Sequence, residues 1–211
     1  MLAQLSLPGF DAPPPQPPKR SLPPAAPRGT RPTQRLFLAL FPQAHDAARI
    51  AEPIDALRQH HGLDGQRLHT DRLHITLLSL GDFAGAVPQV LIDAAMAAAA
   101  TVVHPPMDIV FDRALSFAGR RAGKNAFVLC GRDMAAVSQL GQALGLALKR
   151  AGLRSQPSGK PHMTMLYDGR VIEEHAVEPI RWTASEFVLV LSHLGKTHHE
   201  WLARWPLTRT R

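Results

Sequence analysis

Residues 73–77 read LHITL and residues 161–165 read PHMTM, so a His-x-Thr phrase among hydrophobic residues occurs twice. Side chains on a β-strand alternate between its faces, which places the histidine and threonine of each phrase on one face and their hydrophobic neighbours on the other. We therefore predict two half-buried strands, each with one polar face. The second histidine follows the first by 88 positions, and the repetition favours convergence of both strands on one cleft.

Two imidazoles and two hydroxyls that meet in one cleft suit phosphoryl chemistry at neutral pH. Because histidine titrates at about pH 6.5, one of His74 and His162 can accept a proton while the other donates one. The hydroxyls of Thr76 and Thr164 can donate hydrogen bonds to non-bridging phosphate oxygens, where charge develops in the transition state. This scheme requires no metal and no cofactor. A single His-x-Thr phrase is more often an ordinary half-buried strand, so the hypothesis depends on the second copy.

The composition is that of a chain that can build a sizeable core, with 211 residues of which 45% are hydrophobic. Cys130 is its one cysteine, which excludes an internal disulfide and cysteine-based zinc sites and is typical of a reducing cytoplasm. The start lacks a signal-peptide pattern, and no stretch has the length of a membrane span. We expect a cytoplasmic monomer that does not associate with membranes.

The charge balance points to an anionic partner. A net charge of +7 and a pI near 10.5 make nucleic acid the obvious candidate, although a basic surface can also serve solubility alone. Part of the excess lies in residues 1–34, where Lys19, Arg20, Arg28 and Arg31 stand against Asp11 for a net +3, leaving +4 for the rest.

Residues 1–34 also hold ten of the 19 prolines. Proline cannot donate to a ladder or continue a helix, so this segment is expected to be an extended, disordered tail. A short apolar island at residues 4–10 can act as a docking motif, but a flexible leader is the preferred interpretation. The folded domain is then expected at residues 35–207, followed by a C-terminal tail at residues 208–211.

Strands and helices are interleaved along the expected domain. The apolar run at residues 35–41 predicts a buried strand that ends at Pro42. Helices are predicted over residues 47–57 with a kink at Pro53, over 87–102 and over 134–151. Further strands are predicted over 107–117 and 125–130, and a final hairpin over 182–194 and 199–205. The basic connection at residues 118–124 is either a phosphate- or nucleotide-binding loop or a solvated hairpin tip.

Two pairs of adjacent histidines, His60–His61 and His198–His199, raise the question of a metal site. Adjacent residues on a strand point in opposite directions and do not easily share one ion, and no carboxylate or cysteine cluster stands beside them. We interpret these residues as surface or loop histidines.

The two phrases, read with RLFLAL at residues 35–40, resemble the 2'-5' RNA ligase family. Its members are bacterial and archaeal RNA 2',3'-cyclic phosphodiesterases within the two-histidine phosphoesterase superfamily. Residues 180–190 and 195–207 are similar to the family's C-terminal part, so that the resemblance covers about residues 35–207.

This resemblance implies a bilobal α+β fold: two antiparallel sheets with outer helices, related by pseudo-two-fold symmetry, and a central catalytic groove. It also implies an enzyme of RNA processing that opens a terminal RNA 2',3'-cyclic phosphate with water to leave a 2'-phosphate. His162 would accept the proton of water and His74 would protonate the departing 3' oxygen, while Thr76 and Thr164 hold the phosphate. In reverse, a 5'-hydroxyl replaces water and a 2'-5' linkage forms. The acid and base labels can be exchanged, because the two phrases are nearly equivalent.

One departure from the family concerns the residue just ahead of the second phrase, where many relatives carry a basic or aromatic residue and this chain reads SGKP at residues 158–161. Lys160 can contact the phosphate there, although lysine offers a point charge and not the bidentate fork of arginine. Two other functions stay open: a phosphodiesterase for a small cyclic nucleotide or ADP-ribose cyclic phosphate, and a non-catalytic RNA-binding module.

Overall fold

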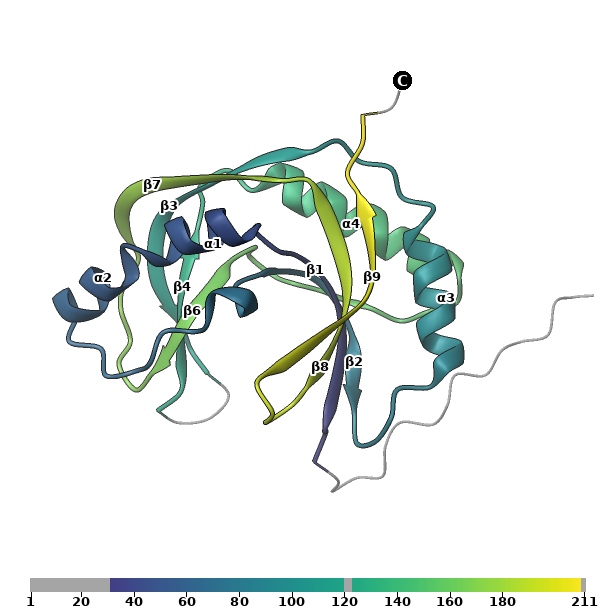
Figure 1. Ribbon diagram of the computed structural model, residues 1–211, viewed down its shortest axis with the longest axis horizontal. Coiled ribbons are helices and arrows are strands. Elements are labelled where there is room, and N and C mark those ends of the chain that lie inside the picture. Colours follow the sequence, from purple (N-terminus) through teal and green to yellow (C-terminus); the bar gives the residue numbers. More distant parts are fainter. Residues whose placement is uncertain (1–30, 120–122, 210–211) are drawn as a thin grey trace, which may run out of the picture.

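The computed structural model describes residues 31–119 and 123–209 (Figure 1). The proline-rich segment up to residue 30 and the centre of the basic connection at residues 120–122 lie outside the described residues, as do residues 210–211. Within the described part, the first strand begins at Gln34, and Thr33 already donates a backbone hydrogen bond to the carbonyl of Phe83.

The described strands form one antiparallel sheet, in which β5 pairs with β2 and the other strands follow the order β7-β3-β4-β6-β2-β1-β8-β9. Their bounds are β1 (Gln34–Leu40), β2 (Ile75–Phe83), β3 (Met107–Phe117), β4 (Asn125–Cys130), β5 (Gln156–Pro157), β6 (Met163–Asp168), β7 (His175–Ala184), β8 (Glu186–His193) and β9 (His198–Pro206). The sheet is continuous, but β2 and β6 are joined only at the pair Ile75–Met163. This junction separates a half with β7, β3, β4 and β6 from a half with β2, β1, β8, β9 and the short β5. The two strands that follow the His-x-Thr histidines meet at it.

Helices pack on the sheet and on one another. They are α1 (Ala44–Ala51), α2 (Ile54–His60), the 3₁₀ turn η1 (Thr70–Arg72), α3 (Gln89–Ala99) and α4 (Ala135–Arg150). α1 contacts β7 and η1, whereas α4 contacts β2 and β5 and is flanked by α3 (Figure 1). The helix expected over residues 47–57 is two helices, because Pro53 has no N–H to continue the ladder and the chain restarts at Ile54. The predicted α+β class is confirmed, but the strands form one continuous antiparallel sheet and not the two sheets that were expected, because the pair Ile75–Met163 joins the halves.

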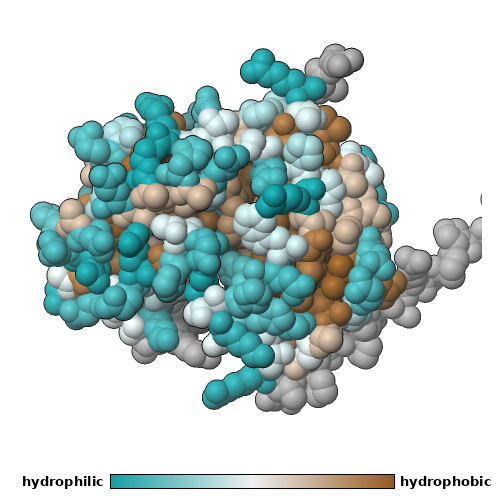
Figure 2. Space-filling view, in the orientation of Figure 1, coloured by the Kyte–Doolittle hydropathy of each residue, from teal (hydrophilic) through white to brown (hydrophobic). Residues whose placement is uncertain are grey.

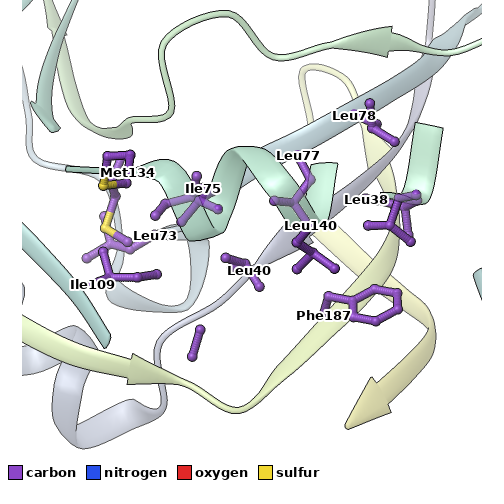
Figure 3. Packing of buried hydrophobic residues seen from close by; sticks show 14 of the residues in the cluster. Leu38, Leu40, Leu73, Ile75, Leu77, Leu78, Ile109, Met134, Leu140 and Phe187 are labelled. Atoms are coloured by element: carbon purple, nitrogen blue, oxygen red, sulfur yellow. The ribbon is translucent and has the colours of Figure 1, made fainter. Parts of the chain in front are cut away.

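One hydrophobic core lies under both halves of the sheet. Leucines of β1 and β2 meet Leu140 of α4, Ile109 of β3 and Phe187 of β8 in the same cluster (Figure 3). The predicted alternation holds in both phrases: Leu73 and Ile75 are fully buried, as are Met163 and Met165. The histidine and threonine of each phrase are half-buried on the other side.

The end of the chain differs from the prediction. The strand expected over residues 182–194 is two strands, because β7 ends at Ala184 and β8 begins at Glu186. β7 pairs with β3 in one half of the sheet and β8 pairs with β1 in the other, so the chain crosses between the halves at Ser185. The first part of β7 alternates exposed and half-buried residues and contains Pro179, which an edge strand tolerates.

Candidate active site

Both phrase histidines are held by the same local contact. Nδ1 of His74 is 2.7 Å from the carbonyl oxygen of Arg72, and Nδ1 of His162 is 2.8 Å from the carbonyl oxygen of Lys160. A carbonyl oxygen only accepts, so Nδ1–H is the donor in each bond. In the neutral rings the free lone pair is therefore on Nε2, which is the atom that can exchange a proton with a ligand. Each histidine lies immediately before the first residue of its strand, which begins at Ile75 or Met163.

The strand register places the histidine of each phrase across from the threonine of the other phrase. The antiparallel pair Ile75–Met163 sets His74 across from Thr164 and, on its other side, His162 across from Thr76. The two rings are close enough that the charge of His162 contributes to lowering the pKa of His74. Within the described residues, neither threonine hydroxyl has a hydrogen-bond partner in the protein. The structure thus brings together the two histidines and the two threonines that the sequence predicted.

The segment before the first phrase runs beside the strand of the second. The buried carboxylate of Asp168, at the end of β6, accepts hydrogen bonds from the backbone N–H groups of Asp64, Gly65 and Arg170 at 2.7, 2.7 and 2.8 Å. Leu68 N–H donates to the carbonyl of Met165 at 2.7 Å. These contacts fix the path of the chain into His74. They also lower the pKa of Asp168, since the N–H of Arg170 and of the two other residues favour the charged carboxylate.

Aromatic rings surround His74. The rings of Phe37 and Phe41 lie 5.2 and 5.3 Å from its ring, the latter stacked, and the ring of His199 meets it edge-on at 5.3 Å. Phe37 and Phe41 belong to a second small cluster with Ala39, Val188 and Val190, separate from the main core. We call the sheet face that carries His74 and this cluster the motif face.

This environment disfavours a charged His74. Burial among the rings is the largest cause and lowers the pKa of His74 to about 4. The cation of Arg72 acts in the same direction, while the bond to the Arg72 carbonyl partly opposes it. The same causes, burial first and then the neighbouring His74 and Arg72, lower the pKa of His199 to about 4. Arg72 has no ion-pair partner in the described part of the chain, and its Nε is buried without a hydrogen bond there.

The surroundings of His162 are more polar. Its ring meets Phe117 edge-on at 4.8 Å, and burial lowers its pKa, opposed by the bond to the Lys160 carbonyl. The Lys160 ammonium donates to Glu174 at 3.0 Å, and Arg113 lies 3.9 Å from the other oxygen of the same carboxylate. The hydrogen bond to Glu174 raises the pKa of Lys160. Lys160 thus lies beside the second phrase, with its backbone orienting His162 and its side chain paired.

A groove of about 1630 Å³ leads away from the phrases along β2, β5 and α4. It reaches the phrases at Thr76 and Pro161, and Lys149 and Arg154 add positive charge to its wall. Figure 2 shows hydrophilic residues over most of the visible face of the molecule, with smaller hydrophobic areas between them.

The remaining histidines are placed differently from one another. His198 is exposed on β9, but His199 is half-buried against Phe37, Phe41 and His74, so its interpretation as a surface or loop residue was wrong. His61 is also half-buried, with Nε2 3.1 Å from Nε2 of His175. In residues 31–119 and 123–209, no three or more His, Cys, Asp or Glu side chains gather in a way that could hold a metal ion. No helix of that part is long and apolar enough to cross a membrane.

The comparison with known families agrees with this geometry. The model of the 2'-5' RNA ligase superfamily matches residues 45–196. The chain belongs to this superfamily. Its members are phosphoesterases and ligases that act on RNA or nucleotide-like substrates, consistent with the two-histidine phosphoesterases that the sequence resembles. No curated protein matches the chain.

Several solved structures share the fold. The structure of E. coli LigT with 3'-AMP has 26% sequence identity to this chain and a TM-score of 0.62. The apo form of LigT has 25% identity and a TM-score of 0.61. Each match covers 85% of this chain and 100% of LigT. TT0787 of Thermus thermophilus is 20% identical with a TM-score of 0.61, over 82% of this chain and 97% of that one. The last comparison supports the fold alone.

Sequence reasoning missed the aromatic half of the site. Phe37 and Phe41 stand in an unbroken apolar run, in which hydrophobicity alone does not distinguish the residues that face the core from those that face the histidine. Their spacing with Ala39 at every second position was the available signal. His199 was missed because its contact with His74 depends on β9 lying beside β8, which only the fold reveals.

Proposed function

We propose that this protein is an RNA 2',3'-cyclic phosphodiesterase that hydrolyses terminal cyclic phosphates to 2'-phosphomonoesters without a metal ion, and that can run in reverse as a 2'-5' RNA ligase. The observation that carries the proposal is the pairing of the phrases. Each histidine donates Nδ1–H to the backbone carbonyl of the residue two positions before it, which leaves its Nε2 free. The two histidines lie across from the two threonines, whose hydroxyls have no partner among the described residues. This arrangement supplies proton exchange and hydrogen-bond donors around one phosphate.

In this mechanism, water attacks phosphorus and passes its proton to Nε2 of His162. The bond from phosphorus to the 3' oxygen breaks, and the 3' oxygen takes a proton from Nε2 of His74. Thr76 and Thr164 donate hydrogen bonds to the non-bridging oxygens. The products are a 2'-phosphomonoester and a 3'-hydroxyl, and the exchange of one proton between the two histidines through solvent restores the starting state.

In this mechanism, His74 becomes protonated at neutral pH only when the substrate is bound. In the unliganded protein the pKa of His74 is about 4, so the ring is neutral at pH 7. A phosphate anion between the histidines favours the imidazolium form and raises this pKa. The cation of Arg72, without an ion-pair partner among the described residues, helps to attract that anion, and the Lys160 ammonium can reach the phosphate by exchanging its contact with Glu174.

The groove supports RNA over a small cyclic nucleotide as the substrate. Its volume of about 1630 Å³ exceeds the range of roughly 300–1,000 Å³ that is usual for small-molecule pockets, and its wall carries Lys149 and Arg154. A chain of several nucleotides fits such a groove better than a single one. The proposal includes the expected setting of RNA processing by a cytoplasmic monomer.

The test is the identity of the product. A short RNA with a 2',3'-cyclic phosphate end is incubated with the protein in excess chelator, and the products are read by phosphorus NMR. We expect a 2'-phosphate at an undiminished rate with chelator. A 3'-phosphate, or activity that chelator abolishes, would contradict the mechanism. Binding of the RNA with no turnover would favour the non-catalytic module, and turnover of adenosine 2',3'-cyclic phosphate alone would favour the small-molecule enzyme.

A further inference from the structure

Trp201 is a large aromatic side chain that the core does not use. The chain has three tryptophans, of which Trp182 is only 3% exposed and Trp205 is half-buried in a stack with Phe187 at 5.1 Å. Trp201 is 41% exposed. An indole that is partly open to water offers a large flat surface against which a ligand can stack.

The position of Trp201 connects it to the candidate active site. It pairs with Val190 of the small cluster on the motif face, and its ring lies 5.0 Å from that of Phe41. The ring of Phe41 is in turn stacked 5.3 Å from that of His74. Two ring-to-ring steps therefore lead from the histidine to the exposed indole. The exposed indole therefore belongs to the same group of rings that surrounds His74.

Arg204 adds a cation to the same surface. Its guanidinium carbon lies 4.6 Å from the centre of the Trp201 ring, a cation–π contact. Its ion pair with Glu186 is long, at 3.7 Å, and both side chains are partly exposed. Arginine planes and aromatic rings together form the stacking surfaces of proteins that bind single-stranded nucleic acid.

We propose that Trp201, with Arg204, is the stacking surface for the base of the nucleotide whose phosphate lies between the two histidines. The inference rests on the proposed function and specifies how its substrate is held. Stacking is tolerant of base identity but favours larger rings, so this surface selects nucleosides over base-free cyclic phosphates and binds purines more strongly than pyrimidines. Trp201 is a binding residue in this account and takes no part in proton transfer.

The kinetic test compares two substrates that differ only in the base. Adenosine 2',3'-cyclic phosphate and base-free ribose 2',3'-cyclic phosphate are assayed with the parent protein, W201F and W201L. W201L keeps an apolar side chain, although a smaller one, and removes the π-face. We expect it to raise KM for the adenosine substrate by roughly 5- to 100-fold with little change in kcat. The base-free substrate should be almost unaffected, and W201F should lie between. V103A, which removes exposed apolar surface outside the groove, is the matched control.

Equal effects of W201L on both substrates, or none on either, would overturn the stacking proposal while leaving the phosphodiesterase intact. A titration that needs no turnover separates the two ideas: adenosine 2'-phosphate should quench the emission of the exposed Trp201 in the parent protein and not in W201F. If neither substrate is hydrolysed but this quenching is seen, the stacking surface stands and the proposed reaction fails. Quenching that survives in W201F would contradict the assignment of Trp201.

Discussion

At the scale of residues, the two histidines are physically unequal despite their matching carbonyl bonds. His74 lies among Phe37, Phe41 and His199, whereas His162 lies near the ion pair of Lys160 with Glu174. The free energy needed to protonate an imidazole is higher among aromatic rings than among polar groups. His74 is therefore the residue whose protonation depends most on the arrival of an anion.

Removing one ring should move the titration of His74. In Phe41→Ala, water reaches the imidazole, and the pKa of His74 should rise from about 4 toward the ordinary value of about 6.5. A histidine NMR titration measures the change, with the exposed His45 as a reference within the same spectra. A His74 curve that does not move in the variant would show that burial by Phe41 is not the cause.

Acid stability follows from the same burial. The folded pKa values of His74 and His199, about 4, lie below the unfolded value of about 6.5, so the unfolded chain takes up protons first as the pH falls. The contribution of these neutral rings to stability is full above about pH 6.5 and is lost progressively down to about pH 4. Thermal unfolding should show Tm falling through this window, and less steeply in His199→Phe. Parallel curves for the two proteins would argue against this role of His199.

Only some of the residues that contact one another in the candidate active site could be predicted from the sequence. The repeated phrase located His74, Thr76, His162 and Thr164, because alternation on a strand is a local property. The rings around His74 come from β1, from the residue that follows it and from β9, and their approach depends on strand pairing across long stretches of sequence. The apolar run at residues 36–41 carries no alternation of polar and apolar residues, so the sequence does not tell which of its two faces lies against the core.

At the scale of elements, the junction of the two motif strands is narrow and needs outside support. β2 and β6 share one pair, and the segment that enters His74 is tied to β6 through the Asp168 carboxylate. The carboxylate serves three backbone donors at once, which an amide oxygen cannot do equally well.

Asp168→Asn should therefore destabilise the fold by about 1.5–3 kcal/mol, the usual cost of losing hydrogen bonds to a charged acceptor. Urea unfolding is the measurement. Asp133→Asn is the matched control, because the exposed Asp133 accepts a single backbone bond, from Ala135 at 3.1 Å, and should cost much less. Equal losses in the two variants would mean that Asp168 does not secure this junction.

Element boundaries were predicted well where local signals are strong. β3 and β4 lie at the expected residues 107–117 and 125–130, and α4 differs from its predicted range by one residue at each end. The division of residues 182–194 between β7 and β8 was not predictable, because both parts have strand propensity and only the partner strands differ.

At the scale of the whole molecule, the two halves of the sheet bring different properties to one site. One half supplies the aromatic surface of Phe37, Phe41 and Trp201, and the other supplies the charged neighbours of His162. Under the proposed function, the groove beside β2, with Lys149 and Arg154 on its wall, would extend the contact surface beyond a single nucleotide.

Salt should distinguish long substrates from short ones. If the groove binds RNA, KM for an oligonucleotide with a cyclic phosphate end should rise steeply between about 50 and 200 mM salt, and KM for a mononucleotide much less. Lys149→Glu combined with Arg154→Glu should flatten this dependence for the oligonucleotide, whereas Lys196→Glu, outside the groove lining, should not. Equal salt dependence for both substrates would leave the groove without a role in RNA binding.

The measurement that tests the central claim most directly is single-turnover hydrolysis of an RNA 2',3'-cyclic phosphate by the parent protein, His74→Ala, His162→Ala and the exposed control His45→Ala. Acid–base catalysis by the pair predicts a rate loss of about a hundredfold or more in each phrase variant and a parental rate in the control. Circular dichroism confirms that each variant is folded. A folded His74→Ala or His162→Ala protein that turns over at the parental rate would contradict the two-histidine mechanism.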